Sequence, residues 1–162
     1  MEKKFGEFYT VEELNRAAAA QKEEGDIEAL YALAKENGID EGTIQDYEEG
    51  YTEELTTPSE AAMAKIRMET EELNLKSQLK DWSDIIQAMC LDDRFARAVF
   101  RPEKKLEDVL AIGLKRASAT RVAVDARICR KAGLGDGRTY IGMIGKTEWK
   151  KIVEEYYCGG ER

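Results

Sequence analysis

Residues 57–75 read TPSEAAMAKIRMETEELNL, and this stretch decides how the rest of the chain is interpreted. Thr57, Pro58 and Glu60 form a helix-start signature, in which a hydroxyl caps the helix, proline occupies its first position and glutamate completes a capping box. The positions that follow are spaced three, four and three residues apart: Met63, Ile66, Thr70 and Leu73. This narrow seam predicts one amphipathic helix to about Leu75 that connects two halves of the chain.

Upstream of this connector, glycines separate three short helical segments. Thr10 and Glu13 form a second capping box, and Asp26 is placed to cap the next helix. The expected helices run from about Val11 to Glu23, from Ile27 to just before Gly38, and from Glu41 to Glu49.

Downstream, apolar residues recur at helical spacing in several segments. We expect helices around residues 82–90, after Asp92, over 106–117 and over 125–131, and a last helix capped by Thr147. Residues 133–145 contain five glycines and predict a loop. The fold class is therefore all-α, with at most one short β-hairpin near 138–145. We expect an N-terminal lobe over 1–57, a connector helix over 58–76 and a C-terminal lobe over 77–162.

Composition excludes several classes of protein. The 162 residues include no histidine, which excludes Ser-His and Cys-His catalytic pairs and histidine-containing metal sites. Cys90, Cys129 and Cys158 are odd in number and far apart, which argues against a disulfide framework or a cysteine metal cluster. No apolar run is long enough for a signal core or a membrane span. We expect a cytoplasmic, non-enzymatic protein with no metal and no cofactor.

The net charge of −8 hides a division between the two halves. Residues 1–75 carry 20 Asp and Glu against 7 Lys and Arg, a net of −13. Residues 76–162 carry 13 against 18, a net of +5. Such an asymmetry indicates two surfaces with different roles.

The acidic candidates lie between residues 40 and 60, where no Lys or Arg occurs. We refer to the following set as the acidic surface: Asp40, Glu41, Asp46, Glu48, Glu49, Glu53 and Glu54. One interpretation is a solvated helix surface. The other is a surface with phosphate-like charge spacing that competes for a basic nucleic-acid channel on another protein.

The basic candidates lie between residues 115 and 131, where only Asp125 opposes them. We refer to the following set as the basic residues: Lys115, Arg116, Arg121, Arg127, Arg130 and Lys131. They predict either a surface that contacts phosphates of double-stranded DNA without reading bases, or a face that pairs with the acidic half of the same molecule.

Other chemistry-bearing residues have a simpler structural explanation. Gly145-Lys146-Thr147 ends like a phosphate-binding loop, but Tyr140 stands where the complete motif needs glycine, so a helix-entry turn is favoured. Two pairs of carboxylates are candidates for acid–base chemistry or Mg²⁺ binding, although capping already explains Asp92: Asp81 with Asp84, and Asp92 with Asp93. Neither motif predicts a catalytic site.

Several stretches of the sequence also resemble known protein families. Residues 12–40, EELNRAAAAQKEEGDIEALYALAKENGID, with TPSEAAMAKI and LKDWSDIIQAMC further on, resemble small proteins of mobile elements in Clostridia, among them type II anti-CRISPR proteins. Residues 92–117 and the ending IVEEYY at 152–157 resemble PcfK-like proteins of conjugative elements, with Glu154 and Glu155 where that family usually carries histidine before the paired tyrosines.

The resemblance implies a non-catalytic inhibitor that binds a type II RNA-guided CRISPR nuclease in the bacterial host cytoplasm. It further implies impaired DNA engagement or cleavage, because such nucleases hold nucleic acid in positively charged channels. The alternative is a DNA-binding accessory protein of a conjugative element. The narrow connector seam leaves both a monomer and a homodimer open.

Overall fold

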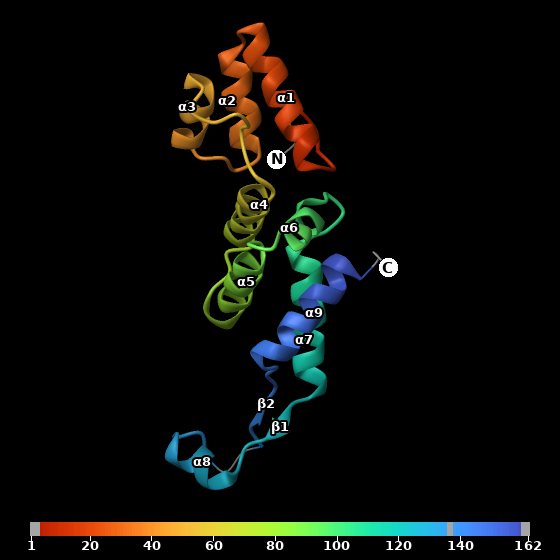
Figure 1. Cartoon of the computed structure of the whole chain (residues 1–162). Helices are drawn as coiled ribbons and strands as arrows, with labels where there is room; N and C mark the ends of the chain where they lie inside the picture. The colour runs from red at the N-terminus through yellow and green to blue at the C-terminus, as the bar shows by residue number, and fades with distance from the viewer. Residues whose placement is uncertain (1–3, 136–137, 160–162) are drawn as a thin grey trace.

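The computed structural model describes residues 4–135 and 138–159, and within them the chain is mostly helical. Nine α-helices and one pair of very short antiparallel strands account for its regular structure in these ranges, which confirms the expected fold class. Figure 1 shows an elongated arrangement, with the first three helices at one end and a strand–helix–strand arm at the other.

The N-terminal lobe consists of three helices: α1 (Val11–Glu24), α2 (Ile27–Glu36) and α3 (Glu41–Glu49). Their starts follow the sequence signals, since Thr10, Asp26 and Asp40 each accept a backbone N–H at the N-cap. Gly25 and Gly50 adopt the left-handed conformation that ends α1 and α3. The expected bounds of these helices are confirmed to within a residue or two.

Helix α4 (Pro58–Glu72) begins with the expected capping box between Thr57 and Glu60. It ends before the predicted Leu75, at a turn in which Asn74 and Ser77 both have positive φ. Its seam faces other helices of the same chain: Ile66 is fully buried, and Met63 packs against the C-terminal core. Leu73, at the C-terminal end of the seam, is 38% exposed, so most but not all of the seam is used within the chain.

The C-terminal lobe packs four longer helices around one core: α5 (Ser77–Met89), α6 (Asp93–Phe100), α7 (Leu106–Ala119) and α9 (Lys146–Cys158). Trp82 and Trp149 lie at its centre with stacked rings. Thr147 does not cap α9, contrary to expectation. Gly145 is the N-cap and provides no side-chain bond, so α9 begins one residue before Thr147.

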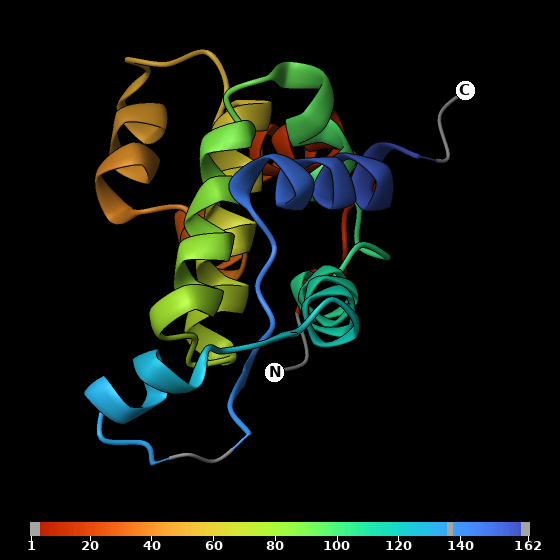
Figure 2. The same ribbon diagram turned by 90° about the horizontal axis from the view of Figure 1, so that it is seen from below.

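Two cores meet along α4. Ala61 belongs to the N-terminal core, whereas its neighbour Ala62 belongs to the C-terminal core. Phe100, at the end of α6, is buried in the N-terminal core, and Arg97 of α6 pairs with Glu12 of α1. The two lobes therefore share side chains across the connector, and Figure 2 shows α4 lying against α5 in the middle of the molecule.

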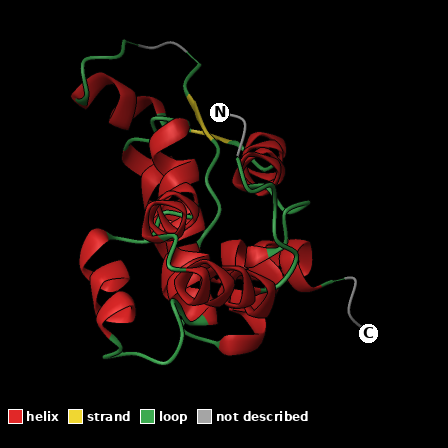
Figure 3. Ribbon diagram, turned by 90° about the horizontal axis from the view of Figure 1, so that it is seen from above, coloured by secondary structure: helices red, strands yellow, loops and turns green. Residues whose placement is uncertain are grey.

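The arm comprises residues 120–145, with β1 (Val122–Ala123), α8 (Ala126–Lys131) and β2 (Tyr140–Ile141). The expected antiparallel pair is present, and β2 lies in the expected range. Its partner, however, comes from before α8, since Val122 pairs with Ile141 and Ala123 with Tyr140. Figure 3 shows the strands between α8 and the helical body. Gly142 lies against the Ala117 carbonyl, where a side chain would collide.

Candidate interaction surfaces

The acidic surface follows α3 and the segment after it, at the N-terminal end of the molecule (Figure 1). Three of its carboxylates take part in local structure. Asp40 accepts from the Thr43 N–H at 3.0 Å and from its hydroxyl at 2.7 Å, which lowers the pKa of Asp40. Glu48 is half-buried and accepts from the Tyr31 hydroxyl at 2.9 Å. Glu54 accepts from Asn15 at 3.5 Å.

The other four carboxylates of the acidic surface are exposed: Glu41, Asp46, Glu49 and Glu53. Gln45 donates to Glu49 at 2.9 Å. Across residues 4–135 and 138–159, no member of the acidic surface has a Lys or Arg within ion-pair distance. Tyr51 lies among them with 77% of its surface exposed. The result is an uncompensated negative surface with one aromatic ring.

The structure places the basic residues at the opposite end, on the last turns of α7 and along the arm (Figure 1). All six are exposed. The ion pairs, hydrogen bonds and ring contact of Arg116, Arg121 and Arg127 do not reach the acidic surface.

Several basic residues already have partners nearby. Arg116 pairs with Glu148 of α9 at 2.9 Å. Arg127 forms two bonds of 3.1 Å with Asp125, which lowers the pKa of that carboxyl. The guanidinium of Arg121 lies 5.4 Å from the centre of the Tyr140 ring. The positive charge of the arm is therefore partly neutralised or stacked.

Sequence reasoning missed the apolar side chains of the arm, which lie beside its cations. Six of them are between 49% and 65% exposed: Val122, Ile128, Leu134, Tyr140, Ile141 and Met143. Cys129 and Ile144 of the arm are buried, whereas Ile128 of α8 is exposed. The signal was the glycine-rich stretch itself, whose short and interrupted apolar segments leave most of their side chains exposed.

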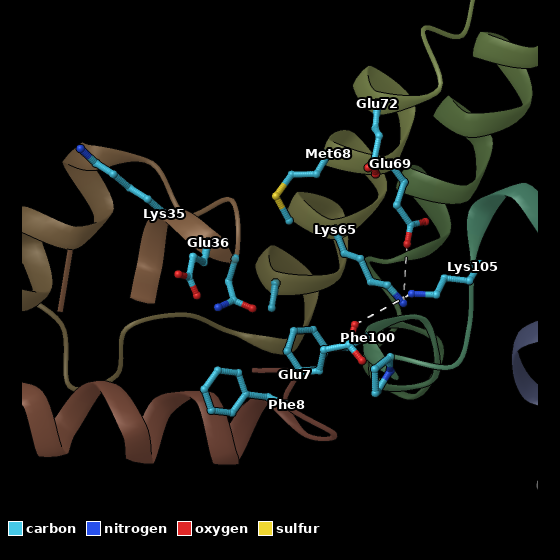
Figure 4. A pocket seen from close by; sticks show the side chains of 13 residues that line it. Glu7, Phe8, Lys35, Glu36, Lys65, Met68, Glu69, Glu72, Phe100 and Lys105 are labelled. Atoms are coloured by element: carbon cyan, nitrogen blue, oxygen red, sulfur yellow. Dashed lines mark ion pairs between the residues drawn. The ribbon is translucent and has the colours of Figure 1, made fainter. Parts of the chain in front are cut away.

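A cavity of about 400 Å³ lies between the lobes, lined by α4, the segment before α1 and the end of α6. Figure 4 shows Lys105 and Glu7 facing each other across it, 4.0 Å apart. Lys65 donates to three carbonyl oxygens at the end of α6, those of Val99, Arg101 and Lys104, at 2.6 to 2.7 Å.

Glu69, also at this cavity, accepts from the Leu106 N–H at 2.9 Å, at the start of α7. Burial raises the pKa of Glu69, and Lys65, 4.0 Å away, opposes this shift. The charged side chains of the cavity thus bind the ends of helices. Lys105, the N-cap of α7, provides no side-chain hydrogen bond, and Glu69 accepts a free N–H of this helix end instead.

The candidate catalytic residues do not converge. Asp92 caps α6 through the Phe95 N–H at 2.8 Å, Asp84 pairs with Lys80, and Asp93 pairs with Arg97. All three cysteines are buried and no disulfide joins them. Burial raises the pKa of Cys90 to about 12, so a thiolate nucleophile is unavailable there at neutral pH.

The Gly145-Lys146-Thr147 segment forms the entry to α9. The strand before it, Tyr140–Ile141, is exposed, whereas a phosphate-binding loop follows a buried strand. Within the described ranges no three His, Cys, Asp or Glu residues are grouped to hold a metal ion, and no helix has the length and apolarity to cross a membrane.

No family model, no curated protein and no solved structure matches the chain.

Proposed function

We propose that this protein is a non-enzymatic inhibitor that binds a type II RNA-guided CRISPR nuclease through its acidic surface. One observation carries the proposal: the exposed carboxylates on α3 and the segment after it have no cationic partner in the described chain. Such nucleases hold guide, heteroduplex and displaced strand in positive channels. A folded negative surface can compete with phosphates for those channels, and the sequence resemblance supports this nuclease as the target.

The physical case rests on a rigid presentation of charge. The Asp40 cap and the Tyr31–Glu48 bond fix both ends of α3 on the lobe. Close charge pairs across an interface contribute about 1.5 kcal/mol or more each, whereas exposed pairs at its edge contribute little. Several carboxylates held together therefore provide enough free energy for a competitive inhibitor.

The test is a charge-reversed variant, Asp46→Lys with Glu49→Lys and Glu53→Lys. Glu48 is left unchanged because its bond to Tyr31 is structural. We expect nuclease binding to weaken more than tenfold, because at least one close pair is lost and about 1.4 kcal/mol is a factor of ten. Binding is measured with purified nuclease, and target cleavage is measured with and without pre-bound DNA to separate blocked loading from blocked catalysis.

A matched control changes net charge by the same amount elsewhere, with Glu71→Lys, Asp81→Lys and Glu155→Lys, all on exposed helical positions. It should inhibit like the parent. A folded acidic-surface variant that still inhibits at full strength contradicts the assigned surface. Absence of inhibition by the parent at large molar excess over several nuclease orthologues contradicts the function itself.

The second candidate is a DNA-binding accessory protein, favoured by the exposed basic residues on a projecting arm. It requires salt-sensitive binding to duplex DNA in the absence of any nuclease. Lys115→Ala with Lys131→Ala should then weaken binding equally for all sequences. The slope of log affinity against log salt should fall by about 0.9 per lost phosphate contact.

A further inference from the structure

The arm displays an apolar surface that nothing else in the described chain covers. Ile128, Leu134 and Met143 are each about 60% exposed, and the strand residues Tyr140 and Ile141 are about half exposed. Several large apolar side chains exposed along one projecting segment favour a docking role, because folded proteins rarely leave so much apolar surface in water.

The charges around this apolar surface indicate the kind of partner. Residues 120–145 carry five Arg and Lys against two Asp. Arg121 lies over the Tyr140 ring, and Arg127, which precedes Ile128 in the sequence, is held by Asp125. An apolar centre with a basic rim is the composition of a protein interface. Its partner needs carboxylates around an exposed apolar or aromatic side chain.

The chain itself carries such a surface at its other end. Tyr51 is the most exposed of its large apolar residues in the described ranges, and it is flanked by Glu49 and Glu53. Figure 1 shows α3 and the arm at opposite ends of the elongated molecule, so one copy does not close on itself. Two copies lying antiparallel bring each arm to the acidic surface of the other.

We propose that the protein forms a two-fold antiparallel dimer in which the arm of each copy docks on the acidic surface around Tyr51 of the other. The two-fold arrangement repeats the contact, so two modest contacts share the area of about 1,600 Å² that a stable interface buries. Opposite charge at the two ends selects this arrangement over a parallel one, which would bring like charges together. The seam of α4, most of which is packed within the chain, plays no part.

The first measurement is sedimentation equilibrium of the full chain over a wide concentration range. We expect a monomer–dimer equilibrium that stops at the dimer and weakens with added salt, because the rim pairs are screened. Ile128→Ser with Leu134→Ser should raise the dimer dissociation constant at least about tenfold, since apolar area is lost from both contacts. A parent that stays monomeric, or that grows beyond the dimer, overturns the proposal.

The decisive experiment uses two charge-reversed chains. The first carries Glu41→Lys, Asp46→Lys, Glu49→Lys and Glu53→Lys, which changes the seven carboxylates of the acidic surface to three negative and four positive charges, so that both of its ends are positive. The second carries three changes in the arm, so that both of its ends are negative: Arg121→Glu, Lys131→Glu and Arg138→Glu. Each chain alone should remain monomeric because its contacts repel.

Mixed in equal amounts, the two chains should form a one-to-one dimer, because each arm now meets a lobe of opposite charge. Recovery to within about threefold of the parent dissociation constant supports the proposal, since a general loss of folding cannot be repaired by mixing. A mixture that stays monomeric overturns it. If the arm variants instead lose duplex DNA binding while the parent is monomeric, the arm's partner is nucleic acid and the dimer is wrong.

The inference goes beyond nuclease inhibition and does not depend on it, since no nuclease is present in these measurements. A parent that dimerises without inhibiting leaves the dimer intact and contradicts only the proposed function. A parent that inhibits the nuclease as a monomer contradicts the dimer and leaves the proposed function intact.

Discussion

The indole ring of Trp149 stacks on that of Trp82, with ring centres 4.5 Å apart, and its N–H donates to the Trp82 carbonyl oxygen at 3.1 Å. The pair joins α9 to α5 across 67 residues of sequence. Gly113 of α7 lies directly against both rings, so the third helix approaches because it has no side chain there.

Gly113→Ala should destabilise the protein. A methyl group at this position would lie 2.5 Å from a Trp149 ring carbon and 2.8 Å from a Trp82 ring carbon, both in a packed core. Overpacking of this kind costs about 1–3 kcal/mol, which exceeds the gain in helix propensity. Urea denaturation monitored by tryptophan fluorescence measures it. Gly42→Ala is the control, because the only atom near its new methyl group would be one Asp40 carboxyl oxygen at 3.2 Å, and it should change stability by less than about 1 kcal/mol.

Lys65→Met should remove a cation that three backbone carbonyls share. The methionine keeps the apolar stem but leaves the end of α6 with unsatisfied acceptors and Glu69 without its nearby cation. We expect a loss of about 2–4 kcal/mol in the free energy of unfolding. Lys80→Met, which breaks an exposed pair with Asp84, should cost less than about 1 kcal/mol. Equal effects of the two variants would contradict the buried role of Lys65.

Glu69 should make stability depend on pH in the direction opposite to most carboxylates. Its pKa is raised in the folded protein from an ordinary value of 4.5, chiefly by burial. The folded state therefore binds more protons than the unfolded state just above pH 4.5, and this contribution to stability is lost as pH rises through the folded pKa.

Glu69→Gln tests this dependence because glutamine keeps an oxygen to accept from Leu106 and carries no charge. The stability of the variant relative to the parent should increase from pH 4.5 toward neutrality. Denaturation midpoints at several pH values give the difference, in which the other carboxylates cancel. A constant difference would mean that the carboxyl titrates normally.

Gly142→Ala should loosen the arm while leaving the helical core intact. A side chain here would collide with the Ala117 carbonyl oxygen, so the returning segment would have to move away from α7. We expect faster trypsin cleavage and faster amide exchange within residues 120–145, with a change of less than about 1 kcal/mol in global stability. Unchanged cleavage would show that the arm tolerates the displacement.

Local rules in the sequence predict much of this fold. The helices begin as expected at three N-caps, because a short side chain with an oxygen atom can accept a free backbone N–H at the start of a helix: Thr10, Thr57 and Asp92. The end of α4 escapes prediction, since Asn74 and Ser77 take left-handed conformations that non-glycine residues rarely adopt. Thr147 escapes for a related reason, because Gly145 can start a helix without a side-chain cap.

The charge of the candidate surfaces could be predicted from the sequence, but the contacts of their side chains could not. Six of the seven carboxylates of the acidic surface are exposed, as in a solvated helix surface, whereas the half-buried Glu48 accepts from Tyr31, a bond that needs the packing of α2 on α3. The roles of Lys65 and Glu69 depend on helix ends that are 34 to 39 residues away in sequence. No local pattern contains such contacts, because they arise only when the two lobes assemble.

Ala61 and Ala62 are adjacent in sequence and serve different cores. If α4 were joined to a foreign sequence at this point, one of its faces would still fit the core of this chain, whereas the other face would have to fit the core of the foreign part. The incoming half would have to supply both a fitting core and a residue in place of Phe100, which reaches into the opposite lobe. Exchange of either end for a foreign module would therefore require a redesign of the helix between them.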